Sequence, residues 1–184
     1  YRVSQDPERN LRADKIKIRN VAKKLVDTDT EVRLMLSLGE MLAAYGALDE
    51  PMNSFMSVED LLDKTNSPAD QAIISSRIAF ANLQQGNHAL AKQNFTNAMK
   101  FAGRERDIAN RINAFTLIAQ RYYDARNTTL ASEILTESQL IAATRLQGAE
   151  RSRVFGQIAA AQLYTGDFDG AIISIANAGA DKAR

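Results

Sequence analysis

Residues 78–98 read IAFANLQQGNHALAKQNFTNA, and related stretches follow at 118–138 (IAQRYYDARNTTLASEILTES) and 158–178 (IAAAQLYTGDFDGAIISIANA). Each stretch begins with Ile-Ala, carries a turn residue near its middle and places an alanine five residues after that turn residue. The interval between the stretches is 40 residues. A fixed period of this size predicts an array of stacked helical pairs, in which no pair buries its apolar face alone.

A fainter copy of the repeat lies one period earlier. The positions of Ile78, Ala79, Gly86, Phe95 and Ala98 are taken there by Leu38, Gly39, Gly46, Phe55 and Val58. The repeat therefore predicts one elongated domain over residues 1–184. We expect an N-terminal basic helix at 1–27 and helical-pair repeats at 28–66, 67–103, 104–146 and 147–184.

Capping signals predict where the helices begin. Asp6-Pro7 and Ser67-Pro68 each combine a side-chain acceptor with a proline at the first helical position, and Thr28 to Glu31 form a capping box. The segment at 49–64 is expected to form one irregular helix or two short pieces. We expect about nine helices in total and no sheet. The expected ranges after the first Pro-initiated helix at about 7–25 are 28–45, 49–64, 67–86, 88–102, 104–126, 129–145, 149–165 and 167–178.

The break between the second and third repeats is expected at Gly103. The charged run that follows, Arg104 to Asp107, would then begin the long helix at about 104–126. Together with Arg111 it predicts intrahelical ion pairs. Each exposed pair at this spacing contributes only about 0.3–0.5 kcal/mol.

The composition argues against catalysis and metal binding. The chain has no cysteine and one histidine, His88, so it lacks the ligands of a conventional zinc site and a thiol nucleophile. The acidic cluster of Glu59, Asp60 and Asp63 is typical of a solvated helix face. We predict a protein that is not an enzyme, with no catalytic residue, no cofactor and no metal.

Charge is uneven although the formal net charge is +1. Residues 1–25 hold eight basic and three acidic side chains, whereas residues 27–63 hold nine acidic side chains and one arginine. A basic first helix allows nucleic-acid binding through residues 9–24, but no aromatics are interleaved for base stacking, which favours a solvated helix face. No apolar run approaches the roughly 18 residues of a membrane span. The absence of cysteine and a first residue other than Met slightly favour the cell envelope and a segment upstream of Tyr1.

The repeated residues resemble the tetratricopeptide repeat (TPR) family. Its pattern of a large-small pair, a Gly-Asn/Asp turn and spaced small and aromatic residues is matched by Ile78-Ala79, Gly86-Asn87, Ala91, Phe95 and Ala98. The later repeats match it through Phe115, Ile118-Ala119, Tyr122, Asn127, Ala131 and Leu135, and through Phe155, Ile158-Ala159, Gly166-Asp167, Ala171, Ile175 and Ala178. The departures are a period of 40 rather than 34 residues, Arg126 at one turn glycine, and no repeat-ending proline. The resemblance implies an all-α fold, a right-handed α-α superhelix of antiparallel helices.

The resemblance also implies a binding surface on the concave face, which the first helix of each pair forms. Carried over position by position, the partner-binding residues are Arg33, Glu40, Gln84, Asn113, Thr116, Gln120, Tyr123, Asp124 and Arg153. Some of these, with Ile73, Phe80 and Leu163 nearby, are alternatively packed between repeats. The Lys and Asn clamp of chaperone-binding members is missing, because its positions hold Arg33, Ile73, Asn113 and Arg153.

Tyr122 is expected in the core between helices, which turns Tyr123 toward the concave side. There Tyr123 is either a peptide anchor beside Asn113 and Gln120 or is partly buried against the neighbouring repeat. The leading hypothesis for function is a non-catalytic scaffold or adaptor that binds a peptide or protein. A regulatory or sensor module of a longer protein is the alternative.

The C-terminal helix predicts self-association. A terminal helix of an array exposes its apolar face unless another helix covers it. Ile172, Ile173, Ile175 and Ala176 are the residues expected to be exposed there, and through them we expect a homo-oligomer or another association.

Overall fold

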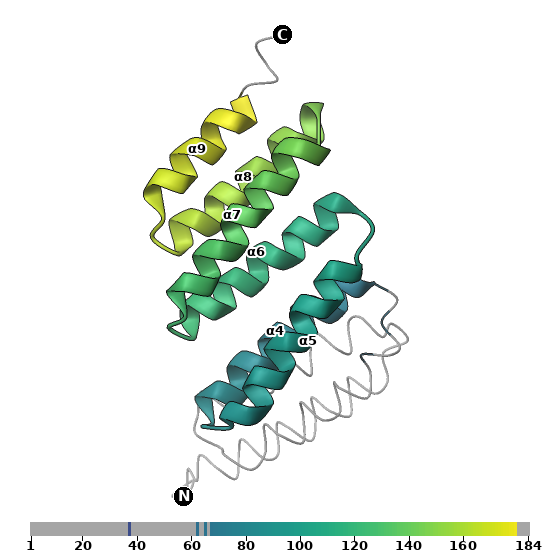
Figure 1. Cartoon of the computed structure of the whole chain (residues 1–184), viewed down its shortest axis with the longest axis vertical. Helices are drawn as coiled ribbons and strands as arrows, with labels where there is room; N and C mark the ends of the chain where they lie inside the picture. Colours follow the sequence, from purple (N-terminus) through teal and green to yellow (C-terminus); the bar gives the residue numbers. More distant parts are fainter. Residues whose placement is uncertain (1–36, 38–61, 63–64, 66, 180–184) are drawn as a thin grey trace, which may run out of the picture. The chain divides into compact units, whose positions relative to one another are not determined.

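The computed structural model describes residues 37, 62, 65 and 67–179. The chain divides into two compact units, Tyr1–Thr65 and Asn66–Arg184. In the second unit the described residues form six α-helices and no strand (Figure 1). They are α4 (Pro68–Gln84), α5 (His88–Arg104), α6 (Ile108–Asp124), α7 (Thr128–Arg145), α8 (Gly148–Tyr164) and α9 (Phe168–Gly179).

Consecutive helices pair, and the pairs stack in chain order. The pairs are α4 with α5, α6 with α7 and α8 with α9. The first helices then pack on one another, α4 on α6 and α6 on α8, so that they form one continuous layer. An all-α array of helical pairs is therefore confirmed over residues 67–179. The helices expected before residue 67, together with Arg33 and Glu40, lie outside the described residues.

Each pair turns through a residue in the left-handed conformation. Gly86 has φ +77°, Gly166 has φ +76°, and Arg126 at the matching position has φ +64°. In each turn the following residue donates its amide to a carbonyl near the end of the first helix, at 2.8–2.9 Å. Glycine adopts this conformation without a Cβ penalty, whereas arginine does not. The three turns thus share one backbone geometry even where the glycine is missing.

Side chains cap the first turns of α4, α7 and α9, and the cap at Ser67 was predicted. Ser67 Oγ accepts the amide of Asp70, Asn127 Oδ1 accepts that of Leu130, and Asp167 Oδ1 accepts that of Gly170. Each bond satisfies a donor that the first turn of a helix leaves open. The starts of α4, α7 and α9 therefore follow from local sequence alone.

The predicted break at Gly103 is wrong, because Gly103 lies inside α5 and the chain leaves the helix at Glu105. Asp107 caps α6 instead, accepting the amide of Asn110 at 2.8 Å. Residues 105–107 are consequently a connection between helices, and the expected intrahelical ion pairs do not form there. Arg111 donates from its guanidinium to the main-chain oxygen of Glu105.

Glu105 holds this connection through hydrogen bonds to two main-chain amides. Its side chain is buried, with Oε2 accepting the amide of Ala69 at 3.2 Å and Oε1 accepting that of Asp107 at 3.0 Å. Ala69 lies in the first turn of α4, where a carboxylate complements the helix dipole. One side chain thereby ties the end of α5 to the beginning of α4.

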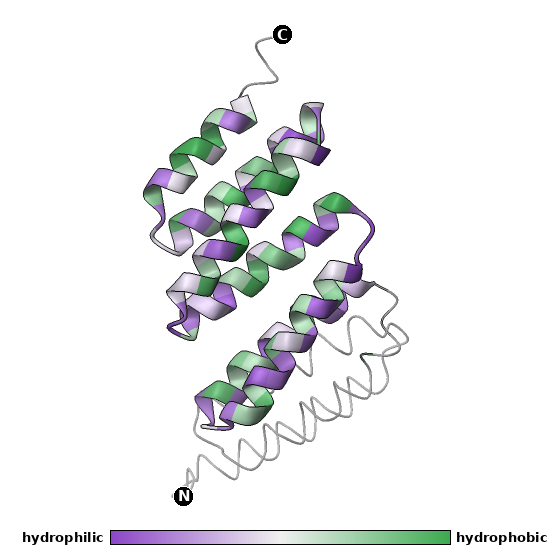
Figure 2. Ribbon diagram, in the orientation of Figure 1, coloured by the Kyte–Doolittle hydropathy of each residue, from purple (hydrophilic) through white to green (hydrophobic). Residues whose placement is uncertain are grey.

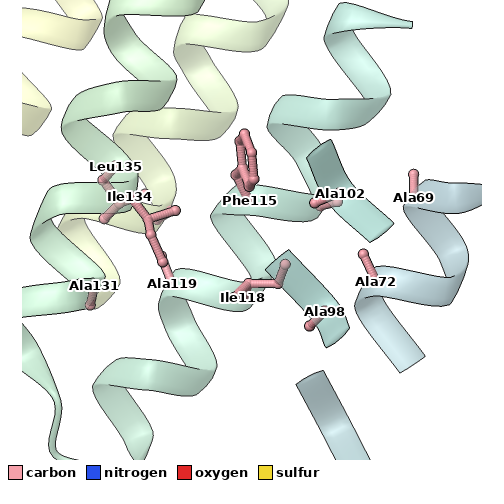
Figure 3. Packing of buried hydrophobic residues seen from close by; sticks show 12 residues of the cluster. Ala69, Ala72, Ala98, Ala102, Phe115, Ile118, Ala119, Ala131, Ile134 and Leu135 are labelled. Atoms are coloured by element: carbon pink, nitrogen blue, oxygen red, sulfur yellow. The ribbon is translucent and has the colours of Figure 1, made fainter. Parts of the chain in front are cut away.

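The core consists of small residues facing larger ones. Ala98 and Ala102 of α5 are fully buried beside Phe115 and Ile118 of α6 (Figure 3). A second cluster packs Ile112 of α6 against the buried residues of α8. Hydrophobic and hydrophilic residues are interspersed along each of the six helices (Figure 2). Small side chains let helix axes approach closely, and the large ones fill the space between pairs.

Replacing a turn glycine measures the effect of backbone conformation on stability apart from that of side-chain packing. A Cβ on Gly166 would meet no atom within 4 Å, so Gly166→Ala costs only the left-handed backbone penalty, about 1 kcal/mol. We expect a lower urea midpoint, measured by circular dichroism at 222 nm. Gly156→Ala is the matched control, because Gly156 is exposed inside α8 with equally open surroundings. Alanine there should raise the free energy of unfolding by up to about 1 kcal/mol and so raise the urea midpoint. Equal shifts in both variants would contradict this account.

Candidate functional site

The candidate surface is the exposed side of α4, α6 and α8, here called the first-helix face. Gln84 at the end of α4 and Arg153 of α8 are exposed. On α6 the predicted residues Asn113, Gln120, Tyr123 and Asp124 are all partly buried. The first-helix face thus brings together six of the nine predicted residues on one layer of helices.

Thr116 belongs to the packing. Only 4% of its surface is exposed, and its hydroxyl donates to the main-chain oxygen of Asn113 at 2.8 Å. Ser76, one period earlier, is buried likewise and donates to the carbonyl of Ile73 at 2.7 Å. This position of the repeat therefore holds a small hydroxyl that bonds to its own helix.

The three neighbouring apolar residues divide between core and surface. Ile73 is partly buried and packs against the hydrophobic core. Phe80 is partly buried beneath the Arg121 guanidinium, which lies 5.7 Å from the centre of its ring. Leu163 is half exposed, at 50%. The expectation of packing between repeats is met for Ile73 and not for Leu163.

A chain of polar and aromatic contacts crosses the first-helix face at the C-terminal ends of its helices. Tyr164 of α8 donates its hydroxyl to Asp124 Oδ1 at 2.7 Å. Arg121 Nη1 lies 3.2 Å from Asp124 Oδ2, and the same guanidinium covers the ring of Phe80 on α4. We call Phe80, Arg121, Asp124 and Tyr164 the cross-helix chain. It fixes the orientation of the Asp124 carboxylate between a cation and a phenol.

Tyr123 takes the second of its two predicted roles. Its ring packs against the core cluster and meets Tyr164 edge-on, with the ring centres 6.0 Å apart. Edge-to-face pairs of this kind contribute about 0.5–1.5 kcal/mol beyond area burial. Tyr122 is half buried and stacks on Phe95 at 4.3 Å, as expected for a position between helices.

Two residues of the cross-helix chain, Arg121 and Tyr164, are absent from the predicted set. The 40-residue register offered a signal for Tyr164, because it occupies the same position as Gln84 and Asp124, both of which were predicted. Arg121 lies at a position that holds alanine in the repeats on either side, Ala81 and Ala161. Register alone therefore gives no reason to expect a cation there.

Neither a metal cluster nor a membrane-spanning helix is found in the described part of the chain. Among residues 67–179 no three His, Cys, Asp or Glu side chains lie close enough to hold a metal ion. None of the six helices has both the length and the apolarity of a membrane span.

The comparisons with known proteins identify the fold. No protein-family profile and no curated protein matches the chain. A crystal structure from Podosopora anserina, described as a "putative kinesin light chain nearly identical TPR-like repeats", superposes with a TM-score of 0.53. The alignment covers 96% of this chain and 87% of that chain at 16% identity. This chain has a TPR-like helical-repeat fold. At this identity the likeness extends to the fold alone.

The pKa of Tyr164 tests the cross-helix chain. The hydrogen bond to Asp124 raises the pKa of the phenol above its usual value of about 10, with smaller contributions from burial and from the carboxylate charge. The neutral phenol is thus favoured in the folded state. Its contribution to stability is present below pH 10 and is lost as the pH rises through the raised pKa.

We expect Asp124→Asn to bring the pKa of Tyr164 back toward its usual value, as followed by NMR of tyrosine labelled at Cζ with ¹³C. The control is Tyr122, whose pKa is raised by burial alone. The pKa of Tyr122 should stay unchanged in the variant. An unchanged pKa of Tyr164 would mean that the contact with Asp124 does not persist in solution.

Proposed function

We propose that this TPR-like chain is a non-catalytic scaffold or adaptor that binds a peptide or protein partner on the first-helix face, taken as its concave face. The observation that carries this proposal is the cross-helix chain, which joins side chains of α4, α6 and α8 before any partner is present. A surface whose side chains are already ordered loses less conformational entropy on binding.

The chemistry of the first-helix face suits a polypeptide. Gln84, Asn113 and Gln120 carry side-chain amides, each able to donate and accept hydrogen bonds as a peptide backbone does. Arg153 adds an exposed cation near the other end of the layer. A partner that combines an extended backbone with acidic side chains would engage both kinds of group.

The test is capture of partners from an extract of the source cells by the full chain. Gln84→Ala, Asn113→Ala and Arg153→Ala are combined, because these side chains lie outside the hydrophobic core and their loss leaves the fold intact. We expect the main captured protein to fall at least about tenfold, the effect of losing roughly 1.4 kcal/mol of binding free energy.

A matched triple variant replaces exposed polar residues of the second helices: Gln93→Ala, Lys100→Ala and Glu137→Ala. This control should retain the partner. Equal circular dichroism spectra of both variants confirm that they are folded. Retention by the first variant together with loss by the control would overturn binding on the first-helix face.

A second contact surface is proposed on the outer side of α9. Ile172, Ile173 and Ala176 are exposed, and so are the residues at the same register in the two preceding repeats. Those residues are polar: Lys92, Gln93 and Thr96 in α5, and Ser132, Glu133 and Thr136 in α7. Among the three helical pairs that the structure describes, the last one alone has apolar side chains at these exposed positions.

We infer that this face associates with the same face of a second copy of the chain. Ile172 and Ile175 continue the helical stripe that begins at Phe168, and all three are more than half exposed. Asp169 is the one charged residue of α9, so two such helices meet with little charge repulsion. The absence of basic residues from α9 disfavours an anionic membrane surface as the occupant.

Light scattering after gel filtration tests this association. At high micromolar concentration the native chain should approach twice its monomer mass of 20.3 kDa. Ile172→Glu should give the monomer, because a buried charge opposes the contact. Leu140→Glu is the control, since Leu140 on α7 is exposed to the same extent, 65%, and should leave the mass doubled. A native chain that stays monomeric would contradict the inference.

A further inference from the structure

The last helix, α9, differs from the other described second helices in what it buries. It packs against α8 and α7 at the C-terminal end of the array (Figure 1). α5 buries Phe95, and α7 buries Ile134 and Leu135. In α9 only Ala171 and Ser174 are buried. The large apolar side chains of α9 are all more than half exposed: Phe168, Ile172, Ile173 and Ile175. α9 therefore docks without burying a large apolar side chain.

A set of hydrogen bonds attaches α9 to its neighbours. Gln139 of α7 donates from Nε2 to the carbonyl of Gly170 at 3.2 Å and to Ser174 Oγ at 2.8 Å. Ser174 in turn donates to Gln162 Oε1 of α8 at 2.8 Å. We call Gln139, Gln162, Gly170 and Ser174 the α9 anchor. It joins three helices through two side-chain amides, one hydroxyl and one main-chain carbonyl.

The α9 anchor requires a glycine at position 170. A Cβ there would lie 2.2 Å from Asp167 Oδ2 and 2.4 Å from Gln162 Nε2. Gln162 is 1% exposed and is bonded to both Asp167 and Ser174. Its amide therefore cannot move aside without losing a hydrogen bond. The docked position of α9 depends on the close approach that Gly170 permits.

The equivalent interval between α5 and α7 lacks these polar groups. The positions of Gln139 and Ser174 are taken there by Met99 and Ile134. Neither of these side chains carries an N–H or O–H group that could bridge the two helices. Within the described pairs, the hydrogen-bonded attachment of one second helix to the next is thus particular to α9.

An attachment of this kind is readily reversed. When α9 leaves, the polar groups of the α9 anchor exchange their mutual hydrogen bonds for bonds to water, so the net loss is small. Burial of a large apolar side chain, in contrast, is lost in full when a helix leaves. Because α9 buries no such side chain, its docking belongs to the low end of the local stabilities in the array.

We propose that α9 is a latch, a helix that undocks from α7 and α8 as one unit and docks again while α4 to α8 stay folded. Gly166, at φ +76°, is the hinge between α8 and α9. The docked state covers the side-chain amide of Gln162, and the undocked state opens it to solvent. The end of the array thereby alternates between two different surfaces. The latch needs no partner and goes beyond the scaffold function proposed above.

Hydrogen exchange of the full chain, followed by mass spectrometry, tests the latch. The chain is kept at low micromolar concentration, so that association between copies does not contribute. We expect the amides of residues 171–178 to be at least about tenfold less protected than those of residues 131–142 in α7. After correction for intrinsic exchange rates, protection should be equal along α9. Simple fraying of a chain end would instead give protection that falls steadily toward Gly179.

A glycine variant tests the role of the α9 anchor. Gly170→Ala should lower the protection of α9 at least about tenfold further and leave α4 to α7 unchanged. Alanine has a higher helix propensity than glycine, so this loss cannot come from a weaker helix. Gly156→Ala is the matched control, because Gly156 is exposed on α8 in open surroundings. It should leave the protection of α9 unchanged.

A second pair of variants tests the contact from α7. Gln139→Ala removes two hydrogen bonds to α9 without altering α8 or α9 themselves, and it should also lower the protection of α9. Glu137→Ala, at an exposed position of the same helix, should not.

Three results would overturn the proposal. The first is equal protection of α9 and α7 in the native chain. The second is protection that declines steadily along α9 toward its C-terminal end. The third is unchanged protection of α9 in Gly170→Ala. Partner capture by the first-helix face and association through the outer side of α9 have their own measurements, so failure of the latch leaves both unaffected.

Discussion

The close approach of the two helices within each pair is the constraint on which the structure depends. It rests on alanines at fixed places: Ala79, Ala119 and Ala159 on the first helices, and Ala91, Ala131 and Ala171 on the second, all at most 4% exposed. A larger side chain at any of them would force the helices apart and strain the turn, because interiors are packed to high density. The first-helix face and the other features of the array depend on this repeated contact between paired helices.

Local features of the fold could be predicted from sequence, and long-range ones could not. The caps at Ser67, Asn127 and Asp167 and the left-handed turns at Gly86 and Gly166 follow from the residue and its immediate neighbours. The predicted helix break at Gly103 was wrong because a glycine near a helix end is also tolerated inside the helix. The observed end of α5 depends on Glu105, whose buried carboxylate accepts a hydrogen bond from an amide 36 residues away. No local sequence pattern predicts such a distant partner.

The candidate site shows the same division. The register correctly placed Gln84 and Arg153 on exposed first-helix positions, since a repeat carries each position to the same side of each helix. It failed for Thr116, whose hydroxyl bonds within its own helix, and it missed Arg121 and Tyr164. Those side chains reach across helices, so their contacts depend on rotamer and helix spacing. Periodicity specifies neither of these quantities.

The different closure of the two intervals between second helices has a mechanical consequence. The pairs α6–α7 and α8–α9 are joined through their first helices and also through Gln139, whereas the α4–α5 pair is joined to its neighbour only through α6. A bending load on the array therefore meets unequal resistance along its length. Within residues 67–179 we therefore expect bending at the interval between α5 and α7, while the pairs α6–α7 and α8–α9 move together.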